Sequence, residues 1–430
     1  MFKWSKNILF LFIFPTLLLI ILTGVFAYKY SYFSKLRIFF DSVPGYVLAQ
    51  FEKKNLKKNQ ISIKIAKEDF EKLKIKREKI LDFKSDVAIV ESYNDTGQFV
   101  KAKLNYMDRN IEAKLTLGGL QHGLKYEKKW PFRVKLEDNQ TLFGINKFVL
   151  YHPKKRNYIF EWLFHKAFNE ENGISPYYDF VPVSINDNYS GIYAIEESFD
   201  KKMLEKNNKE DNPIIKIDMS QYRLKKQLND GAVEDFTAWK DLPIIFWQEN
   251  EKYKNNKIFK ENFAIALNLY DGFRNNLYTT TETFNLKKLA SYVALCDLFQ
   301  GQHALLDHNL MLYFDSDTSL LEPISFESNS IDPRMDLSIE IARTTKDDLH
   351  LNIRNFFKDE KFVKEYIQHL QYYSDRKFLD NFLSSVDKQI NKKLKILNSE
   401  FFYINKKKIN ILYKQQDFIR TNLAKIIKGK

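Results

Sequence analysis

The sequence contains very little cysteine, glycine or proline. Its 430 residues include one cysteine, 13 glycines and 10 prolines. A single cysteine cannot form an intramolecular disulfide, so the chain is not a disulfide-stabilised scaffold. The low glycine and proline contents exclude collagen-like and low-complexity sequences. The one thiol, Cys296, lies in the helical pattern "YVALCDLF" on or near its apolar face, which predicts a buried structural cysteine rather than a nucleophile.

Several motifs that would indicate a particular chemistry are also missing. The sequence has no G-K-[S/T] of a Walker A loop and no G-x-G-x-x-G turn. It has no G-x-S-x-G nucleophile elbow, no EF-hand loop and no H-E-x-x-H helix. These absences argue against P-loop nucleotidases, α/β-hydrolases, EF-hand calcium proteins and the common zinc proteases.

Apolar and basic residues, by contrast, are abundant. Hydrophobic residues make up 44% of the chain and aromatic residues 15%, which is ample for a large core. Lysine and arginine exceed the acidic residues by 68 to 55, giving a net charge of +13. A basic surface favours anionic partners, although a generally lysine-rich composition is the simpler explanation. Nucleic acid is not expected, because the aromatic residues follow core periodicity without the basic interleaving of an RNA-binding sheet.

The N-terminus has the pattern of a membrane anchor. Lys3 and Lys6 precede an uncharged apolar run from Ile8 to Ala27. A helix of that length, at 1.5 Å per residue, matches the roughly 30 Å hydrocarbon core of a bilayer. The run is longer than the apolar region of a signal peptide, which favours an uncleaved signal anchor. Because the lysines precede it, we expect a single-pass membrane protein whose body lies in the periplasm or outside the cell.

The residue patterns divide the whole chain into four regions. Residues 1–28 form the cytoplasmic tip and anchor, and residues 29–86 are a lysine-rich stalk or lead-in. Residues 87–345 begin with segments such as "DVAIVESY" and "QFVKAKLNYM", which alternate like β-strands, and continue with mixed helical and strand patterns. Residues 346–430 are basic and helical. This order predicts an α+β fold with a mainly antiparallel sheet and a helical second half.

A strand lysine and two glutamates form the first candidate site. Lys216 lies among isoleucines in "NPIIKID", where a lysine is costly without a partner. Glu196 and Glu197, in "YAIEESFDKKML", are expected at the start of a helix. A strand lysine paired with a helix glutamate is how kinase-type sites hold nucleotide phosphates. The alternative is a lysine on the solvated face of an edge strand.

A glycine-rich segment between two predicted strands is the second candidate. "LTLGGLQHGLKYEKKWPFRVKL" contains Gly118 and Gly119, followed by basic residues that include Lys129. Glycines let backbone N–H groups approach phosphate oxygens closely, and the basic groups add charge. An ordinary basic hairpin fits the spacing equally well.

The third candidate is "GQHALLDHNLMLYFDSDTSLLEPISFESNS", residues 301–330. Two apolar runs separated by "DSDTS" predict a hairpin that would bring Asn309 and Glu327 close together. An amide and a carboxylate at strand ends suit Mg²⁺ with substrate phosphate. A zinc site that uses His303 and His308 is the weaker alternative, since their spacing matches no common zinc motif. The remaining alternative is a polar turn before a strand.

Taken together, these segments resemble the CotH (spore coat protein H) kinase-like family over about residues 115 to 345, and most closely its membrane-anchored branch. The resemblance lies in the order of the glycine and basic hairpin, "LFGINKFVLYHPKKRNYIFEWLFHKAFNEENGI", "YDFVPVSINDNYSGIYAIEESFDKKMLEKN" with "IIKID", and "ALCDLFQGQHALLDHNLMLYFDSDTSLLEPISFE". It implies an atypical, minimal protein-kinase-like fold that binds ATP with Mg²⁺ and transfers phosphoryl groups to protein serine.

The same resemblance implies roles for individual residues. Lys216 would hold the phosphates with Glu197 as its helix partner, and Asn309 would be the catalytic-loop asparagine. Glu327, with Asn309, would bind the metal. The cofactor-binding hairpin would contribute three further residues, Gly118, Gly119 and Lys129.

The sequence departs from the better-known branch of the family at two places. Ala304 stands where that branch has an aspartate, and "FESN" at 326–329 replaces a W-D-x-D pattern. His303 or Asp307 would then have to act as the base. Histidine is suited to this role because the unperturbed pKa of an imidazole is near 6.5, and Asp307 would match the aspartate that kinases use as their catalytic base.

Two functional hypotheses follow. The first is a membrane-anchored, outward-facing phosphotransferase that uses ATP or another nucleotide with Mg²⁺ and acts on a protein or an anionic envelope acceptor. The second is a pseudokinase or cell-surface scaffold that binds an envelope polymer or a partner without catalysis. The sequence does not indicate the oligomeric state.

Overall fold

A computed structural model describes residues 59–82, 99–118, 121–125, 129–220, 242–247, 255–328, 336–345 and 350–428, with the single residues 43, 47, 56, 222 and 253. The predicted membrane segment, the strand "DVAIVESY" and Gly119 lie outside the described residues. Within the described ranges, no helix combines the length and the apolar character needed to cross a membrane.

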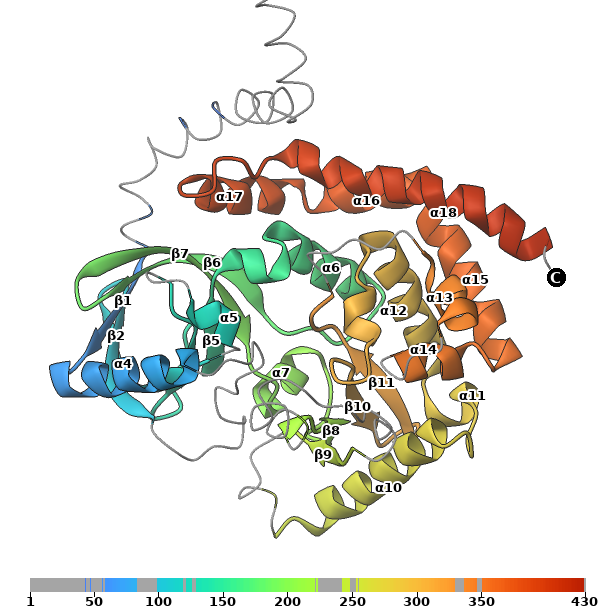
Figure 1. Cartoon of the computed structure of the whole chain (residues 1–430), viewed down its shortest axis with the longest axis horizontal. Helices are drawn as coiled ribbons and strands as arrows, with labels where there is room; N and C mark the ends of the chain where they lie inside the picture. Colours follow the sequence, from blue (N-terminus) through green and yellow to red (C-terminus); the bar gives the residue numbers. More distant parts are fainter. Residues whose placement is uncertain are drawn as a thin grey trace, which may run out of the picture.

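The first half of the chain forms a closed β-barrel (Figure 1). Its strands follow one another in the spatial order β1-β2-β3-β4-β5-β7-β6, and β1 closes the barrel by pairing in parallel with β6, while the other pairs are antiparallel. The strands are β1 (Ile61–Ile65), β2 (Val100–Tyr106), β3 (Arg109–Leu117), β4 (Phe132–Leu136), β5 (Lys147–Tyr151), β6 (Tyr178–Ile185) and β7 (Asn188–Glu197).

Alternation along the strands fills the barrel. In β2, Val100, Ala102 and Leu104 are buried, whereas Lys101 and Lys103 between them are exposed. Because successive side chains point to opposite faces of a strand, this pattern places the apolar set inside the barrel and the lysines outside. The same pattern in β1 and β4 completes one continuous apolar cluster.

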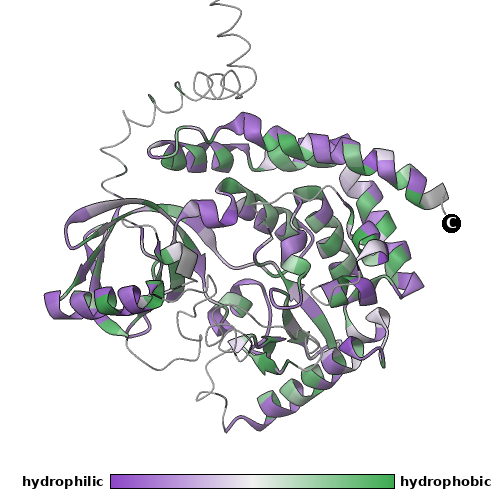
Figure 2. Cartoon of the chain, in the orientation of Figure 1, coloured by the Kyte–Doolittle hydropathy of each residue, from purple (hydrophilic) through white to green (hydrophobic). Residues whose placement is uncertain are grey.

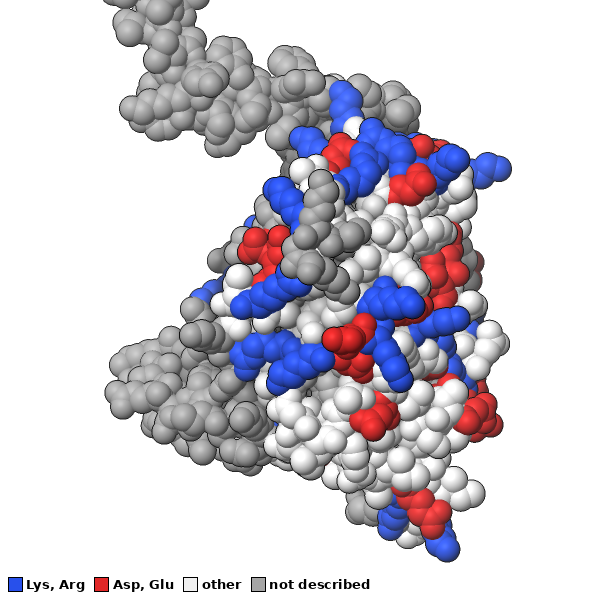
Figure 3. Space-filling view, turned by 90° about the vertical axis from the view of Figure 1, so that its right-hand side faces the viewer, with Lys and Arg blue, Asp and Glu red and all other residues white. Residues whose placement is uncertain are grey.

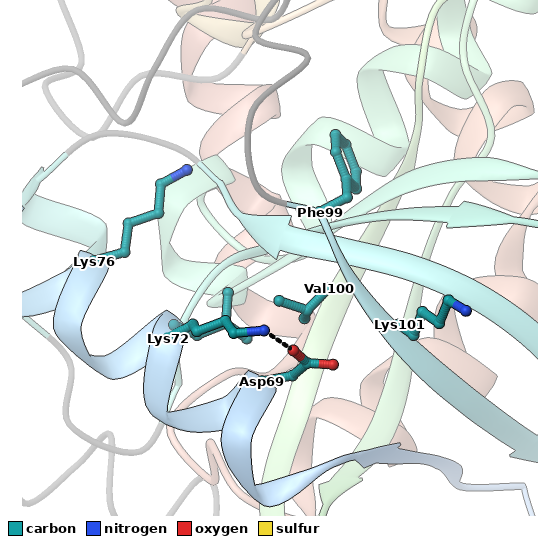
Figure 4. Close-up of a pocket in the computed structure, with 7 residues that line it drawn as sticks. Asp69, Lys72, Lys76, Phe99, Val100 and Lys101 are labelled. Carbon is teal, nitrogen blue, oxygen red and sulfur yellow. Dashed lines mark hydrogen bonds and ion pairs between the residues drawn. The ribbon is translucent and has the colours of Figure 1, made fainter.

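Helix α4 (Lys67–Leu81) packs on the outside of the barrel and buries Leu73 and Ile80 against it. Residues 61–81, which the sequence places in the lead-in, thus form β1 and α4 of the barrel. A groove lies between α4 and β2, where Asp69 accepts a hydrogen bond from Lys72 at 2.6 Å (Figure 4). None of the residues that line it belongs to a predicted site; they are Asp69, Lys72, Leu73, Lys76, Phe99, Val100 and Lys101.

A second sheet and a set of helices form the rest of the molecule. The sheet has the order β11-β10-β8-β9, with β8 (Ile214–Ile217), β9 (Ile244–Phe246), β10 (Met311–Asp315) and β11 (Leu320–Ile324). The short helices are α5 (Gln121–Leu124), α7 (Lys201–Lys206), α11 (Thr280–Thr283), α13 (Ser338–Thr344) and α14 (Leu351–Phe356). The longer ones are α6 (Ile159–Glu170), α10 (Lys257–Arg274), α12 (Leu286–Phe299), α15 (Glu360–Ser374), α16 (Arg376–Ser385), α17 (Asp387–Asn398) and α18 (Ile411–Lys428).

Helix α12 forms the centre of the helical part. Its residues from Leu289 to Phe299 are all buried, among them Cys296, which confirms the predicted structural thiol. Helix α15 packs along it, and α16, α17 and α18 cover the top of the molecule in Figure 1. Hydrophobic residues gather on β10, β11 and α12 in the interior, whereas α4 is mainly hydrophilic (Figure 2).

The structure confirms the predicted α+β class and the helical second half, and it corrects two expectations. The predicted sheet is in fact a closed barrel beside a second, smaller sheet. Glu196 and Glu197 do not begin a helix, because β7 continues to Glu197 through its pairing with β5 and β6. The hairpin predicted within residues 301–330 is confirmed as β10–β11.

Charges of both signs are interspersed on the face in Figure 3, which is the right-hand side of Figure 1. Lysine and arginine side chains alternate there with aspartate and glutamate rather than forming one basic field. The excess of positive charge is therefore not concentrated on this face.

Candidate functional site

The segment before β10 and the end of β11 meet through His303 and Glu327. The 3₁₀ turn Gln302–Leu305 carries His303, whose Nε2 lies 3.1 Å from Oε2 of Glu327. Asn309, which precedes β10, donates a hydrogen bond from Nδ2 to the backbone oxygen of His303 at 2.9 Å. The hairpin thus links the three predicted residues through the His303 turn.

Glu327 has an unusual backbone conformation. Its φ is +50°, in the left-handed region that non-glycine residues rarely adopt. Such residues persist where the surrounding structure fixes them, often at functional sites. Here, Oε1 of Glu327 forms an ion pair with Nη1 of Arg156 at 2.7 Å, while Oε2 faces His303.

Arg156 connects Glu327 to a buried polar cluster. It ends the 3₁₀ turn Pro153–Arg156, is 4% exposed, and its Nη2 lies 3.7 Å from Oε2 of Glu196 on β7. Tyr151 donates a hydrogen bond to the same Glu196 oxygen at 2.8 Å. Arg156 therefore bridges two acidic residues, Glu327 after β11 and Glu196 of the barrel.

Helix α6 contributes Glu161 and His165 to this cluster. The two residues are four positions apart, so they share one face of the helix, and Nε2 of His165 lies 3.7 Å from Oε1 of Glu161. Both are buried, and Ser328 donates its backbone N–H to Glu161 at 3.3 Å. Glu161, His165 and Glu196 each offer one ligand atom, and these atoms lie within 4.8 Å of one another.

Burial determines the electrostatics of the cluster. Burial raises the pKa of Glu161 to about 8 and also raises the pKa of Glu196. Burial and the nearby Arg156 lower the pKa of His165 to about 3, so its imidazole is neutral. For Glu327, burial opposes ionisation, but Arg156 and His303 together hold its pKa well below the usual range. Glu327 is therefore the carboxylate of the site that stays ionised.

Lys216 lies on β8, between β10 and β9, and is only partly exposed. Its ammonium lies 4.1 Å from the centroid of the Trp247 ring. Trp247 contacts Phe199, and Phe199 contacts Phe326, which in turn lies under Arg156 at 5.0 Å. A row of aromatic rings thus runs from Lys216 to the Arg156–Glu327 pair.

Glu197 has other partners. Its side chain forms an ion pair with Lys206 of α7 and accepts a hydrogen bond from the backbone N–H of Tyr177 at 2.9 Å. Burial raises its pKa. Glu197 is therefore held by Lys206 at the end of β7, and it is Glu196 that contacts Arg156.

Asp307 and His308 lie beside the 3₁₀ turn. Asp307 is fully buried, and its Oδ1 accepts the backbone N–H of Asn352 in the first turn of α14 at 3.0 Å. An acidic group at a helix N-terminus stabilises that helix. The His303 and His308 rings lie 6.2 Å apart. Neither belongs to the cluster of potential metal ligands found within the described residues.

The glycine-rich segment contributes mainly to packing. Lys129 is buried, and its Nζ donates hydrogen bonds to the backbone oxygens of Ser190 and Ile192 and pairs with Glu400 at 2.9 Å. These contacts join the barrel to the C-terminal helices. The N–H of Gly118, at the end of β3, donates to the oxygen of Pro131 at 2.8 Å.

The sequence does not predict Arg156, Glu161 or His165 as site residues, and it predicts Glu196 only together with Glu197. The segment "RNYIFEWLFH" does contain a signal, because a glutamate and a histidine four residues apart share a helix face. Nothing local indicates that this face meets Glu196 of β7.

The molecule is an α+β protein whose barrel and helical part meet at buried acidic and basic groups. Comparison of its sequence with known families shows to which of them it belongs. Residues 119–422, more than two thirds of the chain, match the family described as CotH kinase protein. The chain therefore belongs to the CotH kinase family. No curated protein matches the sequence significantly.

Proposed function

We propose that this protein is a phosphotransferase with an atypical kinase-like fold, which moves a phosphoryl group from ATP or another Mg²⁺-bound nucleotide to a protein or cell-envelope acceptor. The observation that carries the proposal is the contact between His303 and the ionised, left-handed Glu327, with Asn309 beside it. Membership of the CotH kinase family supports this reaction class.

The donor set at Glu327 fits a magnesium–phosphate complex. Oε1 of Glu327 contacts Arg156 and Oε2 contacts His303, and each of these carboxylate oxygens can accept a further bond. The Nδ2 group of Asn309 is bonded to the His303 backbone, so its amide oxygen is the atom that can act as a hard ligand. Mg²⁺ bound through one or two such oxygens would neutralise charge on the phosphates. Lys216, at the far end of the aromatic row, would add a positive charge.

His303 is the better-placed candidate base. Its side chain is 40% exposed, whereas Asp307 is fully buried against α14. If Nε2–H donates to Glu327, the lone pair lies on Nδ1, where the imidazole would accept the proton of an acceptor hydroxyl. Glu327 would fix the tautomer and the orientation of the ring.

The second candidate function is a pseudokinase or cell-surface scaffold. Arg156 and His303 both occupy the carboxylate of Glu327, and Ala304, where the better-known branch has an acid, is fully buried. This function predicts a folded protein that neither binds Mg²⁺-nucleotide nor transfers phosphate.

Anchoring and orientation are part of the proposal. The apolar run 8–27 with Lys3 and Lys6 before it supports a single-pass membrane protein whose body faces the periplasm or the outside. The net charge of +13 supports an anionic envelope acceptor as an alternative to protein.

Nucleotide binding separates the two functions. The full chain in detergent should bind ATP by calorimetry with Mg²⁺ and lose at least tenfold in affinity without it. Glu327→Gln and Lys216→Ala should each weaken this binding at least tenfold. Glu112→Gln and Lys103→Ala, which break an exposed ion pair of 3.0 Å on the barrel, are the matched controls and should bind like wild type. Folded wild-type protein that binds no nucleotide in the presence of Mg²⁺ would contradict the phosphotransferase and favour the scaffold.

A further inference from the structure

The cluster of Glu161, His165 and Glu196 contains three buried acceptor atoms, one on each residue. Oε2 of Glu161, Nε2 of His165 and Oε1 of Glu196 are inaccessible to solvent and have no hydrogen-bond partner. The three residues are 0%, 3% and 4% exposed. Buried polar atoms without partners are rare in native proteins and call for an explanation such as a bound ion.

The hydrogen bonds around His165 fix its tautomer. The Ser325 hydroxyl donates to the Ser175 hydroxyl at 2.7 Å, and the Ser175 hydroxyl donates to the backbone oxygen of His165 at 3.3 Å. The single hydrogen of Ser325 is therefore used, so Oγ of Ser325 must accept from Nδ1–H of His165 at 2.6 Å. Nε2 consequently carries a lone pair and no hydrogen.

This tautomer leaves no donor at the centre of the cluster. The Nε2 lone pair faces Oε1 of Glu161 at 3.7 Å, which is beyond hydrogen-bond distance. When both glutamates are ionised, the two carboxylates and the imidazole lone pair cannot satisfy one another, because all three are acceptors. A Lewis acid between them would satisfy all three.

The charges around the cluster also favour a cation. Three carboxylates lie together, those of Glu161, Glu196 and Glu327, and Arg156 is the fully buried cation among them. Lys155, which is half-buried beside the Tyr151 ring, is a second positive charge near Glu196. Three carboxyl groups beside two cations leave room for one further positive charge, which is either a proton on Glu161 or a bound cation.

We infer that Glu161, His165 and Glu196 form a binding site for one divalent transition-metal ion. One imidazole nitrogen with carboxylate oxygens suits Zn²⁺, Mn²⁺ or Fe²⁺, whereas Mg²⁺ prefers oxygen ligands alone. The second shell matches that of metal-binding histidines and carboxylates, because Ser325 accepts from Nδ1 of His165 and Tyr151 donates to Glu196. Ligand atoms around such an ion lie about 3.5 Å apart. The glutamate side chains therefore close in slightly from the present 4.8 Å limit.

This ion would be distinct from any magnesium–nucleotide complex at Glu327, and it would tie α6 of the helical part to β7 of the barrel. The inference does not depend on phosphoryl transfer. It requires only that the three ligands hold a metal in the absence of nucleotide.

The chain contains a matched control for the test. Glu365 and His369 of α15 have the same four-residue spacing and the same Nε2–Oε1 distance of 3.7 Å. Within the described part of the chain, no third ligand joins that pair. Glu161→Gln and His165→Gln should therefore remove the metal, whereas Glu365→Gln and His369→Gln should retain it.

The experiment is metal analysis of the full chain in detergent, without nucleotide, after removal of metals with a chelator and titration with Zn²⁺, Mn²⁺ or Mg²⁺. Wild type should bind about one equivalent of Zn²⁺ or Mn²⁺ and melt at a higher temperature with it, and Mg²⁺ should not compete. The α6 variants should bind at least tenfold more weakly, whereas the α15 control variants should bind like wild type. Folded wild type that binds neither Zn²⁺ nor Mn²⁺ would overturn the inference, since protons would then satisfy the cluster.

If the α6 variants fail to fold, the wild-type protein alone still decides. X-ray absorption at the edge of the bound metal should show one imidazole and otherwise oxygen ligands. Two or more imidazoles, or sulfur, would place the metal elsewhere and overturn the inference.

Discussion

At the scale of single residues, Arg156 organises the site. It is 4% exposed, and its guanidinium lies between Glu327 and Glu196 and against the rings of Tyr151 and Phe326. A planar, permanently charged group suits this position, because it can bridge two carboxylates and stack on aromatic faces at the same time. Lysine could not make both kinds of contact.

Asp297 of α12 gives a prediction about pH. It is fully buried, and burial raises its pKa from 3.8 to about 6, although Gln302, Ser338 and Tyr366 all donate hydrogen bonds to it. A carboxyl whose pKa is higher in the folded than in the unfolded state stabilises the fold fully below the unfolded pKa. That stabilisation is lost as the pH rises through about 6.

We therefore expect wild type to lose about 1 kcal/mol of unfolding free energy between pH 5 and pH 7 relative to Asp297→Asn, which cannot ionise. Urea unfolding of both proteins at the two pH values measures this difference. A difference that stays constant, or that grows in favour of wild type at pH 7, would contradict the prediction.

The sequence alone predicted only those site residues that lie close together in the chain. The pattern around residues 301–330 identified His303, Asn309 and Glu327, because a hairpin brings its own ends together. Arg156 lies 171 positions before Glu327, and no local pattern shows that the two meet. The family resemblance implied Glu197 rather than Glu196. Which of these two neighbouring strand residues faces Arg156 is set by the barrel and not by the local sequence.

At the scale of elements, the 3₁₀ turn with His303 packs directly on the segment after β11. A Cβ atom added to Gly301 would lie 1.8 Å from the backbone oxygen of Ser328, so only glycine allows this approach. The contact keeps His303 and Glu327 in register.

Gly301→Ala should therefore destabilise the protein by about 1–3 kcal/mol and weaken nucleotide binding together with it. Gly123→Ala is the control, because a Cβ there would meet only Pro131 at an ordinary 3.6 Å. Thermal unfolding of both variants checks the prediction. If Gly301→Ala is as stable as Gly123→Ala, the close packing of the turn does not exist in solution.

Individual strands and helices could largely be predicted from the sequence, whereas the closure of the strands into a barrel could not. The sequence pattern predicted the β10–β11 hairpin, because a hairpin depends on contacts between near neighbours. The barrel closes through the parallel pairing of β1 with β6, more than a hundred residues apart in the chain. Nothing in the short "ISIKI" sequence of β1 indicates that this strand pairs with β6.

At the scale of the whole molecule, the C-terminal helices hold the barrel from outside. Lys129 of the barrel side pairs with Glu400, which also accepts the backbone N–H of Ile192 at 2.6 Å. Lys393 of α17 pairs with Asp179 of β6 at 2.6 Å. The family match extends to residue 422 and therefore covers most of these helices. Barrel and helices together position β7, α6 and Glu327.

The central claim is phosphoryl transfer that depends on Glu327, and the most direct measurement is transfer of a radiolabelled γ-phosphoryl group from ATP with Mg²⁺. The full chain in detergent is incubated with cell-envelope protein and polysaccharide fractions, and the Glu327→Gln and Glu112→Gln variants are run in parallel. We predict that wild type and Glu112→Gln label an acceptor in one fraction, or the protein itself, whereas Glu327→Gln, with its fold intact, transfers at least a hundredfold more slowly. Labelling by Glu327→Gln at the wild-type rate, or no labelling by wild-type protein that binds Mg²⁺-ATP, would contradict the account.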